Sequence, residues 1–460
     1  MGITNIIGGY KIKILNKNIV LIFSILVLLM CAISSVAGEN IDSDSLIAID
    51  DSKTFSDVQD AIDGAQENDI IYLNNSNYLG EGKEITISKQ ITIDGANSDG
   101  SGMSTLDAQK LSNIINITST INVTLKNIVF INGNSSTDGG AVYQSLAPGI
   151  MGNLTIENCY FTYNTACNSS GGAIYQSGQP SWKITYKLII KNCNFIDNIG
   201  ISDHFQSNLE SGGAAIYSYA NIYVNNSNFK NNRGYIIKPE DPSLISPVFW
   251  GGAICSRGDN TVTVIENSNF TNNNGTQGGA ICSRGDGAPL NIINCLFENN
   301  TAYDAGAVYL RGTNSPTVIT KSNFTNNKAT FNGGAYWEEY GSSTTIIDSN
   351  FINNTAGTLG GAIYNTLDNS PLDVYNSTFV NNTAVKNGGG IYNDGTNSPL
   401  TVVNSSFTNC TALESGGAIC QAGSESSVKI VNTNFTSNNA AHDGGCICST
   451  LSFFNCYNKL

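Results

Sequence analysis

Charged side chains, and above all those that carry acid–base chemistry, are scarce in this sequence. Only 13% of the 460 residues are charged, and the chain has just four Arg and two His. The formal net charge is −14, which argues against a main role in nucleic-acid binding, because phosphate contacts need clustered cations. The repeats described below contain no paired Asp-Asp and no Gly-His-Gly, so we expect no catalytic residues.

Metal-binding motifs and long apolar runs are missing from most of the chain. No Cys-x-x-Cys pair is followed by a second pair at zinc spacing, and the Gly-Gly-x-Gly-x-Asp calcium repeat is absent. We therefore expect no metal and no cofactor. After residue 37 no apolar stretch is long enough to cross a bilayer. Hydrophobic residues nevertheless make up 40% of the chain, which is enough for a folded core.

The first 37 residues predict an export signal. Three Lys between positions 11 and 17 precede an apolar run from Ile19 to Ala32, and Ser35-Val36-Ala37 has the small residues of a cleavage site. An uncleaved membrane anchor is the alternative, although the run is short for a full span. We expect a signal peptide at residues 1–37, a linker at residues 38–53, and a mature protein that is extracellular or at the cell surface.

Two short motifs alternate through most of the chain. One is Gly-Gly-Ala-Ile followed by Tyr or Cys, as in Gly278–Cys282 and Gly360–Tyr364. The other is Asn-Ser-x-Phe-x-Asn-Asn, whose aromatic residue recurs at intervals that settle at 27 or 28. These aromatic residues are Phe130, Phe161, Phe195, Phe229, Phe270, Phe297, Phe324, Phe351, Phe379, Phe407 and Phe435. A fixed period of this size is typical of a solenoid.

The segments inside each period predict which kind of solenoid forms. Each period contains three short β-type runs separated by Gly, Asn or Ser-Pro, and no helical periodicity runs through the repeats. Three short strands joined by turns form one coil, and successive coils stack in parallel about 4.8 Å apart. We therefore predict an all-β fold, a single-stranded parallel β-helix over residues 134–448. The Phe would form an internal column, the following Asn an amide ladder, and the paired Gly a corner without room for a Cβ.

The two ends of this stack differ from its middle. Ser56 and Gln59 have capping-box spacing at the start of a helix whose apolar face would cover the first coil. We assign residues 54–133 to this N-terminal cap and to the first irregular coils. Residues 449–460 do not continue the repeat and are predicted to form a non-repeat tail.

The candidate binding residues are two copies of one tripeptide. Arg257-Gly258-Asp259 and Arg284-Gly285-Asp286 lie 27 residues apart, and each follows Ile-Cys-Ser. On an exposed turn this tripeptide resembles the integrin-recognition sequence, whereas a duplicated coil with a charged turn is the simpler interpretation. Longer intervals between repeats indicate loops inserted at Asp203–Glu210 and Tyr235–Pro247, and such loops commonly carry the binding specificity of a solenoid.

The remaining arginines and corner carboxylates fall in separate repeats, so we expect neither set to converge. The arginines are Arg233, Arg257, Arg284 and Arg311, and the carboxylates are Asp138, Asp304 and Asp443. Cysteines align between neighbouring repeats, Cys255 with Cys282 and Cys420 with Cys448. Stacked parallel side chains rarely reach the torsion of a disulfide, so we expect thiols packed as small hydrophobic groups.

The combination of motifs resembles known surface proteins. The Gly-Gly-Ala-Ile and Phe-x-x-Asn units are similar to the repeat of chlamydial polymorphic outer-membrane proteins. The segment Thr54–Ile62, followed by Ile91–Gly95 and Val123–Asn127, resembles the start of adhesin-like surface proteins of methanogenic archaea. The resemblance covers about residues 54–448, and it implies a right-handed β-helix of the pectin-lyase type displayed at the cell surface.

We predict from these features an exported adhesin-like protein, a rigid scaffold that binds glycan or protein on neighbouring cells or a host. It would be a monomer, peripheral to the envelope, without nucleic-acid partners. A polysaccharide lyase or hydrolase of the same fold is the alternative, and it would need clustered carboxylates on one face. A purely structural envelope protein is the third possibility, and it would assemble into a lattice without a ligand.

Overall fold

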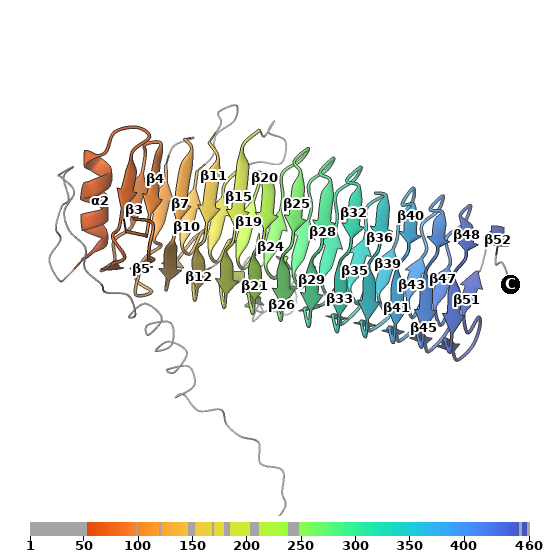
Figure 1. Ribbon diagram of the computed structural model, residues 1–460. Helices are drawn as coiled ribbons and strands as arrows, with labels where there is room; N and C mark the ends of the chain where they lie inside the picture. The colour runs from red at the N-terminus through yellow and green to blue at the C-terminus, as the bar shows by residue number, and fades with distance from the viewer. Residues whose placement is uncertain are drawn as a thin grey trace, which may run out of the picture. The chain divides into compact units, whose positions relative to one another are not determined.

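The structure is a computed structural model that describes residues 53–97, 99–118, 121–145, 152–167, 170–178, 185–202, 211–237 and 248–449, and the backbone of 453–457. The predicted signal peptide, nearly all of the linker and the inserted loop Asp203–Glu210 lie outside the described residues, as does most of the second loop. The described residues belong to one compact unit, Asp50–Leu460, in which short strands coil around a shared interior (Figure 1). The fold is a right-handed parallel β-helix, as the repeats and the resemblance predict.

Three long parallel sheets form the walls of the β-helix. The largest, the 14-stranded sheet, consists of β1 (Ile70–Tyr72), β4 (Ile91–Asp94), β7 (Val123–Lys126), β11 (Leu154–Glu157), β15 (Lys187–Lys191), β20 (Asn221–Asn225), β25 (Thr263–Glu266), β28 (Leu290–Ile293), β32 (Thr317–Thr320), β36 (Thr344–Ile347), β40 (Leu372–Tyr375), β44 (Leu400–Val403), β48 (Ser427–Val431) and β52 (Phe453–Tyr457).

The second wall, which we call the phenylalanine sheet, carries the Phe of each repeat. It consists of β2 (Asn77–Leu79), β5 (Ser104–Asp107), β8 (Ile128–Ile131), β12 (Tyr160–Thr162), β16 (Asn194–Ile196), β21 (Asn228–Lys230), β26 (Asn269–Thr271), β29 (Leu296–Glu298), β33 (Asn323–Thr325), β37 (Asn350–Ile352), β41 (Thr378–Val380), β45 (Ser406–Thr408) and β49 (Asn434–Thr436).

The third wall, which we call the tyrosine sheet, follows the Gly-Gly corner of each repeat. It consists of β3 (Ile85–Ile87), β6 (Ile115–Ile117), β10 (Val142–Gln144), β14 (Ile174–Gln176), β19 (Ile216–Ser218), β24 (Ile254–Ser256), β27 (Ile281–Ser283), β31 (Val308–Leu310), β35 (Tyr336–Glu338), β39 (Ile363–Asn365), β43 (Ile391–Asn393), β47 (Ile419–Gln421) and β51 (Ile447–Ser449).

Shorter strands bridge the corner between the phenylalanine and tyrosine sheets. One group is β9 (Asn134–Ser135), β13 (Thr165–Ala166), β17 (Ile199–Ser202) and β22 (Arg233–Ile236); another is the pair β18 (Ser211–Gly212) and β23 (Phe249–Trp250). The third is β30 (Thr301–Ala302), β34 (Lys328–Ala329), β38 (Thr355–Ala356), β42 (Thr383–Ala384), β46 (Thr411–Ala412) and β50 (Asn439–Ala440). A typical coil therefore has a fourth strand that the repeat pattern did not predict.

The phenylalanine column is the centre of the core. One Phe in each strand from β8 to β49 points inward, and neighbouring ring centroids lie 4.5 to 5.3 Å apart with interplanar angles of 10° or less. The ten rings from Phe130 to Phe407 are fully buried. Burying one such side chain contributes about 2–3 kcal/mol, and the predicted column is confirmed.

The Asn-Asn pair after each Phe turns the chain and then binds the next coil. Asn299 has a positive φ of 54°, a conformation that Asn tolerates better than most residues. Asn300 is fully buried, and its Nδ2 donates to the Phe270 carbonyl at 2.9 Å and to Asn327 Oδ1 at 3.0 Å. The ladder consists of Asn164, Asn198, Asn232, Asn273, Asn300, Asn327, Asn354 and Asn382. It satisfies buried amides that would otherwise destabilise the core, and it confirms the predicted ladder.

The Gly-Gly corner is required by geometry. Gly278 has a φ of +73°, which strains any residue with a Cβ. A Cβ added to the following Gly279 would lie 2.1 Å from the Gly306 carbonyl oxygen of the next coil. The corner thus favours Gly at both positions, as the sequence predicts, and Ala replaces it once at each position, as Ala305 and Ala214.

One helix of the described residues, α2 (Phe55–Gly64), packs on the first coils, as the capping-helix prediction requires (Figure 1). Its buried side chains are Phe55, Val58 and Ile62. The N-cap is Thr54, whose capping box is completed by Asp57, so the predicted start at Ser56 is two residues late. Within the described ranges, no helix has the length and apolar character needed to span a membrane.

The stack continues slightly beyond the recognisable repeats. The strand β52 lies inside the predicted non-repeat tail, yet it pairs in parallel with β48 and adds one strand to the 14-stranded sheet. Its sequence lacks both repeat motifs, so the pairing depends on backbone hydrogen bonds that are available to any extended segment.

Candidate binding site on the outer face of the tyrosine sheet

The outer face of the tyrosine sheet carries a continuous column of aromatic and Cys side chains. Side chains alternate along a strand, so in β31 Val308 and Leu310 point into the core and Tyr309 points outward. The in-register pairing of successive strands aligns these outward residues one above the other. The column contains Tyr143, Tyr175, Tyr217, Cys255, Cys282, Tyr309, Trp337, Tyr364, Tyr392, Cys420 and Cys448.

A second column beside the first contains three arginines in neighbouring coils. The backbone N–H groups of Arg257, Arg284 and Arg311 donate to Ser218, Ser256 and Ser283 carbonyls at 3.0, 2.9 and 2.8 Å, so the parallel pairing continues past the strand ends. The expectation that all arginines are dispersed is therefore wrong for these three, which we call the arginine column. The 27-residue intervals between them equal one full coil, and that is why they stack. Arg233 lies elsewhere, on β22.

The two Arg-Gly-Asp tripeptides are built into this stack and do not project as free turns. Asp259 Oδ1 accepts from the backbone N–H of Asp286 at 3.0 Å, and Asp286 Oδ1 accepts from Thr313 N and Oγ1 at 2.8 and 2.9 Å. A Cβ added to Gly285 would lie 2.0 Å from the Gly258 carbonyl oxygen. The tripeptides thus serve the stacking of the turns, which agrees with the simpler interpretation of the sequence.

Trp250 fills a gap in the aromatic column and supports the arginines. Cys255 and Cys282 are smaller than the Tyr or Trp found in most coils, and Trp250 packs with both of them in one buried cluster. The centre of its ring lies 3.7 Å from Arg284 Cζ and 4.9 Å from Arg311 Cζ. Arg284 is only 9% exposed in this arrangement. Cation–π contacts of this kind fix the guanidinium groups in place.

A shallow hollow of about 370 Å³ opens over the arginine column. We call it the arginine hollow, and it is lined by Arg257, Asp259, Arg284, Asp286, Arg311, Thr313 and Tyr340. Arg311 Nη2 donates to Tyr340 Oη at 3.4 Å, and Arg311 Nε lies 3.9 Å from Glu339 Oε2. Tyr309 Oη donates to the same Glu339 oxygen. Cations, hydroxyl groups and an aromatic ring therefore meet at one surface hollow.

The cysteines under this site are not suited to nucleophilic chemistry. All ten Cys of the described ranges are free thiols. Burial, together with the neighbouring Cys255 thiol, raises the pKa of Cys282 well above its usual value, so the thiol stays protonated at neutral pH. Cys255 and Cys282 thus act as small packing residues beneath Trp250, as expected.

The corner carboxylates lie at different levels of the stack, as expected. Asp443 pairs laterally with Ser415, and Asp304 pairs with Gln277, whose Nε2 donates to Asp304 Oδ2 at 3.3 Å. Burial raises the pKa of Asp304 to about 6, and the negative charge of Glu339 adds to this effect. Asp304 thus has a proton affinity in the range that general acids use.

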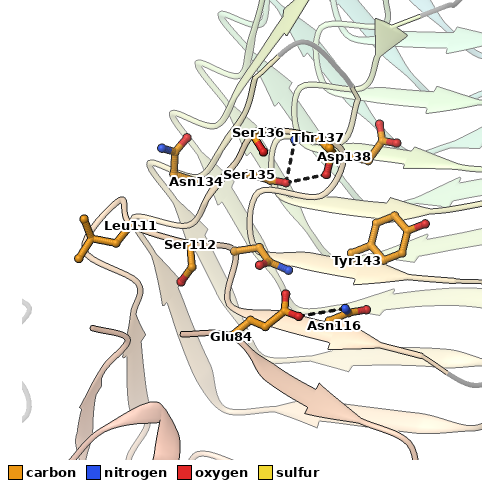
Figure 2. Close-up of a pocket in the computed structure, with 11 residues that line it drawn as sticks. Glu84, Leu111, Ser112, Asn116, Asn134, Ser135, Ser136, Thr137, Asp138 and Tyr143 are labelled. Atoms are coloured by element: carbon orange, nitrogen blue, oxygen red, sulfur yellow. Dashed lines mark hydrogen bonds between the residues drawn. The ribbon is translucent and has the colours of Figure 1, made fainter. Parts of the chain in front are cut away.

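A second hollow of about 430 Å³ lies near the first irregular coils (Figure 2). Its walls are small polar side chains such as Ser135, Thr137 and Asn116, and Asn116 Nδ2 donates to Glu84 Oε1 at 3.2 Å. Figure 2 shows Glu84 beside Asn116 at one end of the hollow and Asp138 beside Thr137 at the other. This hollow offers two separated carboxylates and no cation, so the arginine hollow is the stronger candidate for a binding site.

The predicted tripeptides supply four of the seven residues that line the arginine hollow. Arg257, Asp259, Arg284 and Asp286 were candidates, whereas Arg311, Thr313, Tyr340 and the supporting Trp250 were not. The interval of 27 residues from Arg284 to Arg311 was a usable signal, because it equals the repeat. No repeated spacing pointed to Trp250, because it lies outside both repeat motifs.

Three segments of the chain match the Chlamydia polymorphic membrane protein repeat, at residues 158–177, 348–366 and 376–394. Each contains a Phe unit, a Gly-Gly corner and one strand of the tyrosine sheet. The match supports the bacterial part of the resemblance, and the archaeal part finds no support. No curated protein matches the chain.

The chain is also similar to two solved structures. The catalytic unit of a GH87 α-1,3-glucanase from Streptomyces thermodiastaticus strain HF3-3 is 12% identical, with a TM-score of 0.42 over 93% of this chain and 70% of the glucanase. A PL6 alginate lyase in complex with a trisaccharide is 11% identical, with a TM-score of 0.30 over 88% of this chain and 87% of the lyase. Such distant likenesses do not bear on the activity of this chain.

Proposed function

We propose that this chain is a surface-displayed, adhesin-like scaffold that binds saccharide or protein ligands of other cells through the outer face of the tyrosine sheet. The observation that carries the proposal is the arginine hollow, which gathers three of the four arginines of a weakly charged chain on one face. The inward side chains hold the rigid stack together, so the outer columns provide the surface for ligand contact. The matches to the Chlamydia polymorphic membrane protein repeat support a location at the cell surface.

Retention on a broad ligand array tests this function. The full chain would be applied to immobilised soluble glycans and polymers and, separately, to intact cells. We expect retention by at least one ligand class without any shortening of the polymers. A chain that assembles into a regular lattice and is retained by no saccharide or cell would instead be a structural envelope protein, and the proposal would fail.

A polysaccharide-active enzyme is the second candidate, and Asp304 is the observation that favours it. Its raised pKa suits a general acid, and Glu339 lies close enough to contribute to that pKa. The same array tests it when polymer length is measured after incubation. Catalysis would be established if the polymer is shortened by the parent chain and by the exposed variant Glu414→Gln but not by Asp304→Asn. That result would displace the adhesin proposal.

A further inference from the structure

We propose that the buried side chain of Glu338 carries a proton in the folded chain and donates it from Oε2 to Asn365 Oδ1, which forms a pH-sensitive hydrogen bond between two neighbouring coils. This inference goes beyond the proposed function and does not depend on it. It follows from three features of the core: two buried oxygens without a donor, a column of amides that runs in one direction, and the groups that surround the carboxyl group.

Two buried acceptor atoms lie on the neighbouring strands β35 and β39. Glu338 and Asn365 are directly opposite each other in the parallel pairing of these strands, and both side chains are fully buried. Glu338 Oε2 and Asn365 Oδ1 have no hydrogen-bond partner among the described residues. An unsatisfied acceptor is costly in a core, and two acceptors cannot satisfy each other. A proton on Glu338 Oε2 turns one of them into a donor and satisfies both atoms.

The amides that follow Glu338 run in one direction along the stack. Asn365 Nδ2 donates to Asn393 Oδ1 at 2.6 Å, and Asn393 Nδ2 donates to Gln421 Oε1 at 2.6 Å. In each step the donor belongs to the earlier coil, and the acceptor oxygen faces back toward it. By the same pattern Asn365 Oδ1 faces the coil of Glu338, so the pattern requires a donor at position 338.

Backbone carbonyl groups fix this direction. Asn365 Nδ2 also donates to the Ser370 carbonyl at 2.6 Å, and Asn393 Nδ2 also donates to the Ser398 carbonyl at 2.7 Å. Turning either amide over would place its oxygen against a carbonyl oxygen and would break two hydrogen bonds. Asn365 therefore keeps its Nδ2 away from Glu338, and the proton between the two residues has to come from the carboxyl group.

No other donor bonds Glu338 Oε2 in the described part of the chain. The other oxygen, Oε1, accepts from the backbone N–H groups of Tyr340 and Ser342 at 2.8 and 3.0 Å. The hydroxyl group of Ser370 lies near the carboxyl group, but Ser370 Oγ donates its single proton to the Thr366 carbonyl at 2.9 Å. The carboxyl group therefore has one oxygen left, and that oxygen can bond only the next coil.

The surroundings of Glu338 also favour its protonated form. Burial raises the pKa of Glu338 to about 7, and the negative charge of Glu339 adds to this effect. Tyr336 lies on the same strand and stays neutral, because burial raises its pKa as well, and its hydroxyl pairs with Thr344 Oγ1 at 2.7 Å. The opposite residue in the preceding coil is the apolar Leu310. Above pH 7 the proton leaves, two acceptors oppose each other, and the contact between the coils weakens.

Infrared spectroscopy of the full chain detects the proton directly. A protonated carboxyl group has a carbonyl stretching band that a carboxylate lacks, and a hydrogen bond lowers the frequency of this band. The spectrum of Glu338→Gln is subtracted from that of the parent chain. We expect the band at about nine-tenths of its full intensity at pH 6 and at about one-hundredth at pH 9. Asp304, whose pKa is about 6, titrates in both proteins and cancels in the difference.

Asn365→Leu tests the acceptor, and Asn393→Leu is the matched control. Each variant removes one buried amide and leaves a Ser carbonyl unpaired, but only Asn365 lies opposite Glu338. We expect the band to move to higher frequency in Asn365→Leu and to keep its frequency in Asn393→Leu. Circular dichroism would establish that both variants are folded, and the exchange measurement described next needs neither of them.

Amide hydrogen exchange over residues 363–370 tests whether the proton joins the coils. The parent chain is compared with Glu338→Gln, whose amide donates at every pH. After correction for the intrinsic exchange rate, the protection of these residues in the parent relative to the variant should fall about tenfold from pH 6 to pH 8. This factor is what a pKa of about 7 in the closed state and 4.5 in the open state implies.

The other outcomes overturn the inference. Absence of the band at pH 6 would mean that Glu338 is ionised in the folded chain. A band that keeps its frequency in Asn365→Leu, or that moves equally in Asn393→Leu, would mean that Asn365 is not the acceptor. Constant relative protection of residues 363–370 from pH 6 to pH 8 would mean that the proton does not hold the coils together. These results leave the proposed function untouched, because it is tested by ligand retention.

Discussion

Glu338 makes the stability of the β-helix depend on pH in a calculable way. Its side chain points into the core from β35 and is fully buried. Glu338 Oε1 accepts from the backbone N–H groups of Tyr340 and Ser342 at 2.8 and 3.0 Å. Burial nevertheless raises the pKa of Glu338 from 4.5 to about 7. The equivalent residues of the next two coils, Asn365 and Asn393, are neutral amides.

The sign and size of the effect follow from this pKa. Below pH 4.5 the carboxyl group is protonated in both the folded and the unfolded chain, so it costs nothing. Between pH 4.5 and 7 the unfolded chain releases the proton while the folded chain keeps it, so the free energy of unfolding falls as pH rises. Each unit of pKa shift corresponds to about 1.4 kcal/mol, so at pH 8 the free energy of unfolding is about 3 kcal/mol lower than below pH 4.5.

The substitution Glu338→Gln removes this titration and keeps an acceptor for the two N–H groups. We expect the variant and the parent to be similar at pH 4, and the variant to be more stable by about 3 kcal/mol at pH 8. The assay is urea unfolding at both pH values, with amide hydrogen exchange over residues 336–347 because a solenoid need not unfold in one step. The exposed Glu414→Gln is the control, and it should show no such pH-dependent difference.

The reasoning is refuted by a difference between Glu338→Gln and the parent that stays constant from pH 4 to pH 8. Such a result would mean that Glu338 does not titrate in this range in the folded chain. Other groups contribute to the pH dependence of both proteins, but their contributions cancel in the comparison.

Three further substitutions test the packing of the stack, each by urea unfolding. Asn327→Ala removes an amide that makes four buried side-chain hydrogen bonds and should cost about 3–6 kcal/mol, whereas the exposed Asn323→Ala should cost less than about 1 kcal/mol. Phe297→Ala interrupts the phenylalanine column and should cost about 3–5 kcal/mol, and a cost below about 1 kcal/mol would show that the column contributes little. Gly306→Ala places a Cβ 2.1 Å from the Gly334 carbonyl oxygen and should prevent native stacking at that corner; an unchanged unfolding midpoint would contradict the corner geometry.

Most of the scaffold could be predicted from the sequence because each of its rules is local and repeated. The Phe of one repeat needs only the Phe of the next at the same register, so an interval of 27 or 28 is sufficient to predict the column. The same holds for the buried Asn and for the Gly-Gly corner. The N-cap at Thr54, the extra strand at the corner and β52 were missed, because no repeated residue type marks them.

The candidate site is where sequence reasoning was incomplete. Arg257, Arg284 and Arg311 stack because they lie 27 residues apart, which is one repeat. This interval can be read directly from the sequence. What only the tertiary structure decided is the position of Trp250, which enters from the end of an inserted loop and occupies the space left by Cys255 and Cys282. A periodic pattern specifies what neighbouring coils share, whereas the position of a side chain outside the pattern depends on the space that its neighbours leave.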